Sequence, residues 1–281
     1  MAARKTLGPG PTEARNPRTL DLDRLTPHCL LARILEEDAS VPAAVREALP
    51  ELELASDALL VVLERGGRWF NIGAGTSGRL GALDAAEIPP TYGLDPDRVQ
   101  ALIAGGEAAL SRAVEDAEDN TEAAGRDLAA RGFGAGDVLL ALSASGHTPY
   151  ALGAVRFARD AGAPTIGVTC AQGSPLDAAV DIAISVEVGP EVVAGSTRMK
   201  GGLAQKMVLH ALSTSVMVRL GLVRSNLMTG MRGDSCKLRD RALRITMELS
   251  GRSRSEALAA LEQARGNVER ALTYLSASDN Q

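Results

Sequence analysis

The stretch Arg68-Trp69-Phe70-Asn71-Ile72-Gly73-Ala74-Gly75-Thr76-Ser77-Gly78 decides the fold of this 281-residue chain. It opens as a short apolar run, passes into a glycine loop and continues into a helical pattern. Further short apolar runs occupy residues 99–104, 137–142, 165–169 and 182–186. Such runs, alternating with helical stretches, are typical of a parallel sheet covered on both faces. We therefore predict a doubly wound α/β domain, a flavodoxin-like sandwich.

The rest of the chain reads as helices around this domain. We predict an extended arm to about residue 26, helices from residue 27 and over 41–64, and helices over 107–131, 150–161 and 200–222. Beyond Asn226 the pattern is helical throughout, and residues 245–275 resemble a three-helix ubiquitin-associated fold. We interpret this tail as a packing or dimerisation element and infer no ubiquitin recognition. The predicted domains are 1–55 (arm and helices), 56–222 (the α/β sheet domain) and 223–281 (small helical domain).

Composition excludes several classes of protein. The net charge of -5 argues against nucleic acid as a partner, because such binders concentrate Lys and Arg. No apolar run approaches the ~20 residues of a membrane span, and no secretory signal opens the sequence. Three widely spaced cysteines indicate a reducing compartment, and three scattered histidines form no metal cluster. We predict a cytoplasmic protein that needs neither metal nor cofactor.

Two loops rich in glycine and hydroxyls follow predicted strands, where open α/β sheets bind ligands. They are Gly73–Gly78, which includes Gly75, Thr76 and Ser77, and Ser143–Thr148, which includes Ser145 and Gly146. Glycine lets backbone N–H groups approach an anion, and a following helix N-terminus adds positive potential. These features favour a phosphomonoester. A dinucleotide fold is the alternative for the first loop, but the second strand lacks the acidic tip that a ribose requires. Tight turns without a ligand remain the other alternative.

Longer strings make a family recognisable. The Ser143–Thr148 loop resembles the phosphosugar signature of sugar isomerase (SIS) domains. The strings 73–93 (GAGTSGRLGALDAAEIPPTYG), 103–119 (IAGGEAALSRAVEDAED) and 189–206 (GPEVVAGSTRMKGGLAQK) closely resemble the N-acetylmuramic acid 6-phosphate etherase family. His147 departs from the family pattern in the second loop. The resemblance implies a sugar-phosphate substrate bound by Gly75, Thr76, Ser77, Ser143, Ser145, Gly146 and Thr148, with Glu191, Ser196 and Lys200 on a loop that closes over it.

The same resemblance implies two functional glutamates, Glu87 and Glu118. On a single helix over 107–131, Glu118 would flank the stripe of Leu110, Val114 and Ala117, and partial desolvation there would raise its pKa. A solvated surface acid is the alternative. Glu87 stands just before two prolines, which are expected to end its helix and leave the carboxylate at the unfavourable end of the dipole.

The chemistry implied by the family is a lyase reaction in N-acetylmuramate catabolism, in peptidoglycan recycling or in uptake of external sugar. D-lactate is eliminated from C3 of the open-chain sugar, and water then adds. Glu87 is expected to protonate the ether oxygen and Glu118 to act as base. Two alternatives stay open on the same fold: an aldose–ketose isomerase and a non-catalytic sugar-phosphate sensor.

A distance predicts a homodimer with shared sites. Glu87 lies ten residues beyond Ser77, roughly 15 Å along a helix at ~1.5 Å per residue. A hexose does not span that gap between its phosphate and C3. Either the helix stops early and folds back, or a two-fold partner supplies its Glu87.

Overall fold

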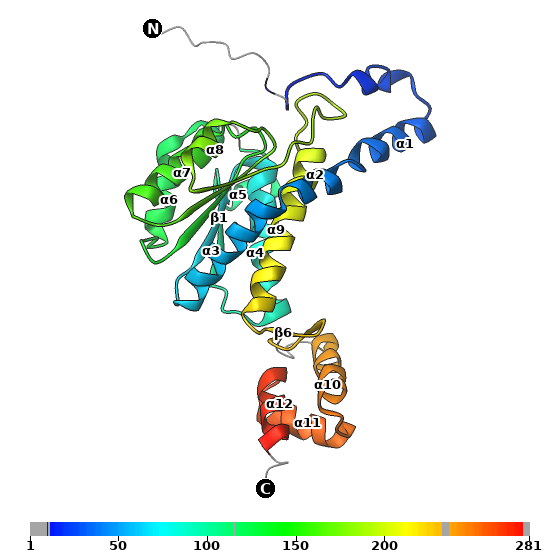
Figure 1. Ribbon diagram of the computed structural model, residues 1–281, viewed down its shortest axis with the longest axis vertical. Coiled ribbons are helices and arrows are strands. Elements are labelled where there is room, and N and C mark those ends of the chain that lie inside the picture. The colour runs from blue at the N-terminus through cyan, green and yellow to red at the C-terminus, as the bar shows by residue number, and fades with distance from the viewer. Residues whose placement is uncertain (1–9, 11, 115, 232–235, 278–281) are drawn as a thin grey trace.

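A computed structural model describes residues 10, 12–114, 116–231 and 236–277 of the chain; residues 1–9 and 11 of the predicted arm lie outside them. Five strands form one parallel sheet in the order β2-β1-β3-β4-β5 (Figure 1). They are β1 (Trp69–Gly73), β2 (Val99–Ile103), β3 (Val138–Leu142), β4 (Thr165–Thr169) and β5 (Ile182–Ser185). The order is that of flavodoxin-like sheets, whose direction of winding reverses between β1 and β3. The doubly wound α/β prediction is confirmed.

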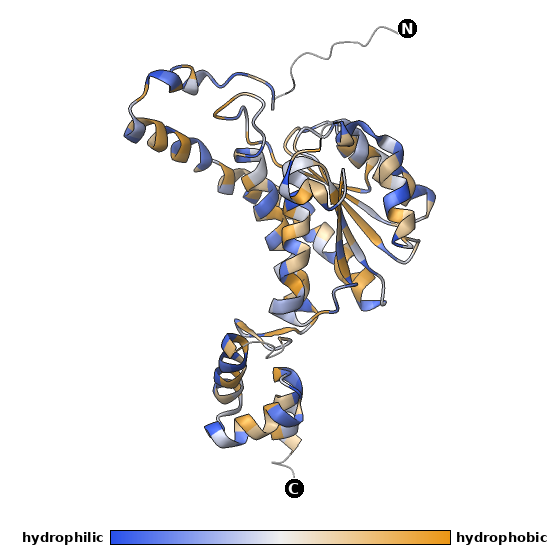
Figure 2. Cartoon of the chain, turned by 180° about the vertical axis from the view of Figure 1, so that it is seen from behind, coloured by the Kyte–Doolittle hydropathy of each residue, from blue (hydrophilic) through white to orange (hydrophobic). Residues whose placement is uncertain are grey.

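Helices cover both faces of the sheet because successive side chains of each strand point to opposite sides. Leu140 and Leu142 belong to one core, and Leu139 and Ala141 to the other. The first core is closed by α2 (Val41–Glu47), α3 (Leu49–Glu64), α4 (Gly75–Tyr92) and α9 (Lys200–Arg219), and the second by α6 (Thr121–Ala130), α7 (Pro149–Asp160) and α8 (Pro175–Ala179). The strands accordingly form a hydrophobic centre between the two helical layers (Figure 2).

The single helix predicted over 107–131 is wrong. The structure has α5 (Ala108–Ser111), the 3-10 turn η3 (Ala117–Asp119) and α6. Asp116 adopts a left-handed φ of 60°, which an α-helix cannot continue through. Asn120 then caps α6, its side chain accepting a hydrogen bond from the backbone N–H of Ala123. The predicted apolar stripe therefore does not exist as one face.

The expectation that two prolines end the helix of Glu87 is also wrong. Helix α4 contains Pro89 and Pro90 and continues to Tyr92. Gly93 ends it in the left-handed region, at φ 69°, and donates from its N–H to the carbonyl of Pro89 at 2.9 Å. Tertiary packing overrides the local signal, because Ile88 is buried in the core beside the prolines. Glu87 is thus not in the last helical turn, and the dipole argument does not apply.

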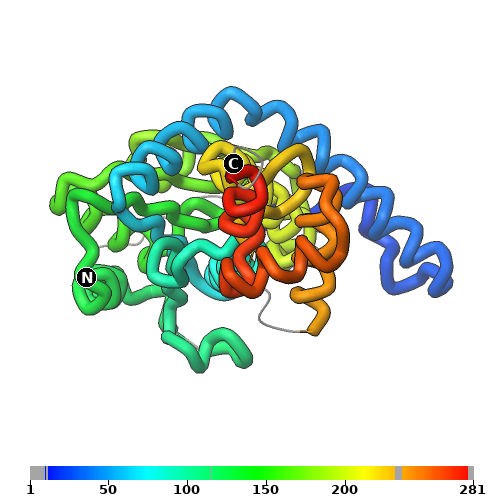
Figure 3. Tube along the Cα trace, turned by 90° about the horizontal axis from the view of Figure 1, so that it is seen from below, coloured from blue at the N-terminus to red at the C-terminus, as the bar shows by residue number. Residues whose placement is uncertain are grey.

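Helix α1 and the C-terminal helices extend from the sheet domain in different directions (Figures 1 and 3). At the N-terminal side, the predicted extended arm contains short turns η1 (Pro17–Thr19) and η2 (Leu22–Arg24) before α1 (Pro27–Asp38), and the predicted 41–64 helix is divided at Ala48 into α2 and α3. At the C-terminal side, helix α9 ends at Arg219, and the hairpin β6 (Val223–Arg224) and β7 (Leu227–Met228) corrects the expectation of uninterrupted helix.

Three helices follow the hairpin, as predicted: α10 (Cys236–Ser250), α11 (Arg254–Gln263) and α12 (Val268–Ala277). They pack around a core of their own that includes Leu243, Leu261 and Leu272. The N–H of Glu269 donates to the carbonyl of Thr229 at 3.0 Å and joins this unit to the hairpin region. The division into three domains stays a prediction. None of the helices in the described part of the chain combines the length and apolar character that a membrane crossing requires.

Candidate functional site

Both predicted phosphate loops begin side by side at the carboxyl edge of the sheet. Gly73, the last residue of β1, is in register with Leu142, the last residue of β3. This pair of strands is where the winding of the sheet reverses, the usual ligand position in such folds. The topology therefore brings the two loops together.

The first loop leaves backbone donors free at the start of α4. Ala74 is the N-cap and has no side-chain oxygen to accept from the first turn. Within the described residues, no protein group accepts from the N–H groups of Gly75, Thr76 or Ser77. Gly78 permits the close packing of this turn, because a Cβ there would lie 2.6 Å from the carbonyl oxygen of Gly73. Unpaired N–H groups at a helix N-terminus form a site suited to an anion.

The second loop holds its hydroxyls in a fixed arrangement. Ser143 Oγ accepts from the N–H of Gly146 at 3.0 Å and lies 2.8 Å from Thr148 Oγ1. Ser145 Oγ accepts from the N–H of His147 at 3.2 Å and lies 3.5 Å from Ser143 Oγ. Gly146 has a φ of 69°, and a Cβ there would collide with the side chain of Ser174 at 2.2 Å. Three hydroxyls thus converge in a turn that only glycine can close.

The start of α9 lies between the two loops. A Cβ on Gly201 would lie 3.4 Å from the side chain of Ala144, and one on Gly202 would lie 3.4 Å from that of Thr76. Glu191 is 1% exposed, and its carboxylate accepts from the N–H groups of Lys200 at 2.8 Å and Gly201 at 2.9 Å. Burial raises the pKa of Glu191, although these two hydrogen bonds oppose the rise.

Three residues predicted for the closing loop thus have distinct positions. Glu191 accepts hydrogen bonds from the first two N–H groups of α9. Lys200 is 3% exposed, with its ammonium 3.2 Å from Glu37 Oε2. Ser196 is half-buried, and its N–H donates to the carbonyl of Val193 at 2.9 Å. Their roles in binding substrate stay predictions.

Glu118 lies on the exposed turn η3, so the expected burial on a helix flank is wrong. It nevertheless lines a cavity of about 200 Å³ together with Gly75 and Arg79. The first phosphate loop and one of the predicted glutamates therefore share a cavity within one chain.

Sequence reasoning missed Arg79. Its guanidinium donates from Nε to the carbonyl of Leu110 at 3.2 Å and from Nη2 to that of Arg112 at 3.1 Å. These bonds hold the end of α5, from which the chain continues to Glu118. The partners of Arg79 are backbone carbonyls, which leave no signal in the sequence.

Glu87 lies outside this cavity. It is exposed on α4 beside Leu83, Ala86 and Pro90, which are also exposed, and Leu83 is 46% exposed. Positions 83, 86, 87 and 90 share one helical face. The opposite face is buried and carries Asp84, whose Oδ1 accepts from Ser213 Oγ at 3.2 Å and lies 3.7 Å from Lys206 Nζ. Burial raises the pKa of Asp84, against the effect of Lys206.

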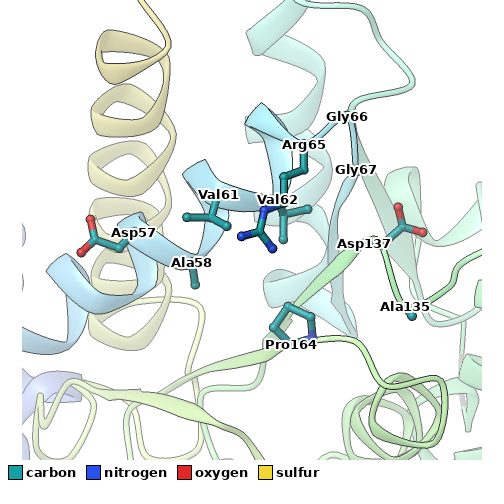
Figure 4. A pocket seen from close by; sticks show the side chains of 11 residues that line it. Asp57, Ala58, Val61, Val62, Arg65, Gly66, Gly67, Ala135, Asp137 and Pro164 are labelled. Atoms are coloured by element: carbon teal, nitrogen blue, oxygen red, sulfur yellow. The ribbon is translucent and has the colours of Figure 1, made fainter.

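Another cavity lies at the opposite edge of the sheet and is not the candidate site. Its volume is about 690 Å³, and it lies between α3 and the turns that precede β1, β3 and β4, with Val61, Arg65 and Pro164 in its wall (Figure 4). Ligands of open α/β sheets bind at the carboxyl ends of the strands. Among the described residues, no group of three or more His, Cys, Asp or Glu side chains could hold a metal ion.

Comparison with known proteins agrees with this geometry. Residues 53–159 match the glucokinase regulatory protein N-terminal SIS domain, and residues 113–215 match the SIS domain. A solved phosphoheptose isomerase from Francisella tularensis superposes with a TM-score of 0.54 at 22% identity, over 68% of this chain and 98% of that one. A phosphoheptose isomerase from Neisseria gonorrhoeae superposes with a TM-score of 0.50 at 20% identity, over 66% and 98% of the two chains. These likenesses support the fold.

Curated relatives are much closer in sequence. The N-acetylmuramic acid 6-phosphate etherase of Cronobacter sakazakii (strain ATCC BAA-894) is 50% identical over 266 residues, which is 95% of this chain and 90% of that protein. The protein of the same name from Yersinia pestis (strain Pestoides F) is 48% identical over 270 residues, 96% of this chain and 92% of that one.

Proposed function

This chain belongs to the N-acetylmuramic acid 6-phosphate etherase family, and from that premise we propose how Glu87 and Glu118 perform the family's reaction. The activity is that of a carbon–oxygen lyase, which cleaves the D-lactyl ether of N-acetylmuramic acid 6-phosphate to N-acetylglucosamine 6-phosphate and D-lactate. The observation that carries this assignment is 50% identity over 95% of the chain. A pair of anion-binding loops at one edge of the sheet supports it.

The phosphate of the sugar binds at the two loops. The free N–H groups of Gly75, Thr76 and Ser77 lie at the N-terminus of α4, where the helix dipole favours an anion. Ser143, Ser145 and Thr148 contribute hydroxyl donors from the neighbouring strand end. The phosphate fixes one end of the open-chain sugar, so that C2 and C3 are presented to proton-transfer groups.

The ether then leaves by elimination. An alkoxide is a poor leaving group unless its oxygen is protonated, whereas the C1 aldehyde of the opened sugar acidifies the proton on C2. Glu118 removes the C2 proton, Glu87 protonates the lactyl oxygen at C3, and the C3–O bond breaks to give D-lactate and an unsaturated aldehyde. Water adds at C3 and a proton returns to C2, which completes N-acetylglucosamine 6-phosphate. Each proton-transfer group contributes ~10²–10⁴-fold.

The site is composed of two chains. Because α4 is unbroken from Gly75 to Tyr92, Glu87 stays roughly 18 Å along the helix from its own anion site at ~1.5 Å per residue. The fold-back that would close this gap within one chain is absent from the described α4. The apolar exposed face of α4, with Leu83, Ala86 and Pro90 around Glu87, suits a two-fold contact. Each protomer of a homodimer then presents Glu87 to the loops of its partner.

The compartment that fits this chemistry is the cytoplasm. Cys29, Cys170 and Cys236 are free thiols in the structure, and free thiols persist where glutathione keeps them reduced.

The test is to incubate the purified chain with N-acetylmuramic acid 6-phosphate in ¹⁸O-labelled water. We expect stoichiometric D-lactate without label and N-acetylglucosamine 6-phosphate that carries the label at C3. Label in the lactate would indicate displacement at the lactyl carbon and would end the elimination scheme. An isomerase or a sensor would release no lactate at all.

A further inference from the structure

Glu37 is a buried carboxylate that the mechanism does not use. It lies on α1, outside the sheet domain, and is 5% exposed. Its Oε2 accepts from Asn16 Nδ2 at 2.8 Å and lies 3.2 Å from the ammonium of Lys200, and its Oε1 lies 2.9 Å from Arg18 Nε. Burial would raise the pKa of Glu37, but the hydrogen bonds from Asn16 and Lys200 hold it below its usual value. The carboxylate is therefore charged at neutral pH. Its Oε2 accepts both hydrogen bonds, whereas Oε1 accepts none from the described residues and is only ion-paired with Arg18.

The groups around Glu37 also hold the loop between β5 and α9. Asn16 Nδ2 donates to the carbonyl of Pro190 at 3.3 Å. Thr19 Oγ1 donates to the carbonyl of Val192 at 2.8 Å, and the carbonyl of Thr12 accepts from the N–H of Gly195 at 3.2 Å. The segment that precedes α1 is thus hydrogen-bonded to this loop at Pro190, Val192 and Gly195.

The far end of the loop reaches the candidate site. The N–H of Gly202 donates to the carbonyl of Thr197 at 2.8 Å, and Gly202 packs against Thr76 of the first phosphate loop. A displaced loop would carry the start of α9 with it, because Glu191 joins the two through its hydrogen bonds to Lys200 and Gly201.

We propose that the buried Glu37–Lys200 ion pair fastens the 189–199 loop against the sugar-phosphate site, which makes Glu37 a positioning residue for substrate binding. The N-terminal segment from Thr12 to Asp38 acts as a clamp, and Glu37 is its fixed point. Removing one partner of a buried ion pair leaves an uncompensated charge, so the loss of the Glu37 charge releases Lys200 and the loop together.

The experiment compares Glu37→Gln with Glu36→Gln. The first change keeps the shape of a buried side chain and removes its charge, whereas Glu36 is the neighbouring exposed carboxylate, 3.6 Å from Arg33. Trypsin reports the loop, because Arg198 is exposed within it. We expect Glu37→Gln to speed cleavage after Arg198 on the order of tenfold or more, since cleavage follows local opening. Glu36→Gln should match the unaltered chain.

Kinetics give the second readout. KM for N-acetylmuramic acid 6-phosphate should rise about tenfold in Glu37→Gln with kcat changed much less, the sign of lost uniform binding. Thr19→Val keeps the ion pair and removes a single bond to the loop, so cleavage should quicken by only about threefold. If Glu37→Gln does not fold, Thr19→Val tests the clamp instead, and cleavage and KM equal to those of Glu36→Gln would overturn the proposal.

Cleavage and KM equal to those of Glu36→Gln would overturn the proposal. Faster cleavage with unchanged KM would overturn it as well, because the loop would then have no part in binding. The kinetic readout rests on the proposed function, but the cleavage readout does not. A chain without etherase activity that still shows charge-dependent cleavage would thus separate the two failures.

Discussion

Glu87 and Glu118 stand on segments of contrasting construction. Glu87 belongs to the 18-residue helix α4, whose inner face buries Ala85 and Ile88 against the core. Glu118 belongs to a three-residue turn without buried residues, in a segment that Arg79 tethers through two backbone carbonyls. The first carboxylate is placed by a rigid element but far from its own anion site. The second is close to that site but depends on a few hydrogen bonds. Rigid placement and proximity are thus divided between the two residues.

The largest effect should come from removing either carboxylate. We expect Glu87→Gln and Glu118→Gln each to lower kcat/KM by ~10²–10⁴-fold with the fold preserved, since each removes a proton-transfer group. Steady-state release of D-lactate measures this. Glu122→Gln, an exposed carboxylate on α6, is the matched control and should leave the rate unchanged. Near-normal turnover in either variant would exclude that glutamate from the mechanism.

A smaller effect on the rate should come from loosening the segment that carries Glu118. Arg79→Met removes both hydrogen bonds to the carbonyls of Leu110 and Arg112. We expect kcat to fall roughly 10–100-fold, because small misplacement of a catalytic group is costly. Arg126→Met, which changes an exposed arginine of α6 that pairs with Glu122, is the control. Equal rates for the two variants would show that Glu118 does not rely on the tether.

A substitution at the C-terminal end of α4 should affect the stability of the fold more than the catalytic rate. Gly93 has a φ of 69°, and a Cβ there would lie 2.0 Å from the carbonyl oxygen of Gly230. We expect Gly93→Ala to lower the free energy of unfolding by about 2–4 kcal/mol, from backbone strain and this collision. Gly66→Ala has the strain alone, at φ 85° with nothing within 4 Å, and should cost about 1 kcal/mol. Urea unfolding of both variants measures the difference. Equal losses would mean that this close contact does not hold α4 in place.

The sequence predicted the sheet because its strands are continuous apolar runs, a signal that survives without knowledge of tertiary contacts. It failed at both glutamates, for a different reason at each. Burial of the Ile88 side chain in the core keeps α4 helical through Pro89 and Pro90, although proline alone favours a helix end. The left-handed Asp116 and the Asn120 cap break the second segment, although its apolar spacing suits one helix.

The site could be predicted only in part. The glycine and hydroxyl loops are local in sequence, so their residues were found directly. Glu37 and Asn16 were not, because their partner Lys200 and the loop they hold lie more than 160 residues further along the chain. No local pattern marks a carboxylate whose environment is assembled from such distant segments. Arg79 was missed although it is close in sequence, because its partners are backbone carbonyls, which carry no sequence signal.

The central claim, that one site takes Glu118 from the chain that binds phosphate and Glu87 from its partner, is tested most directly by mixing Glu87→Gln and Glu118→Gln chains under conditions that allow exchange. A mixed dimer then contains one intact site and one site that lacks both carboxylates. An equal mixture should recover about a quarter of the unaltered activity, since about half the dimers are mixed and half their sites are intact. No recovery, with subunit exchange demonstrated independently, would place both glutamates of a site in one chain and contradict the account.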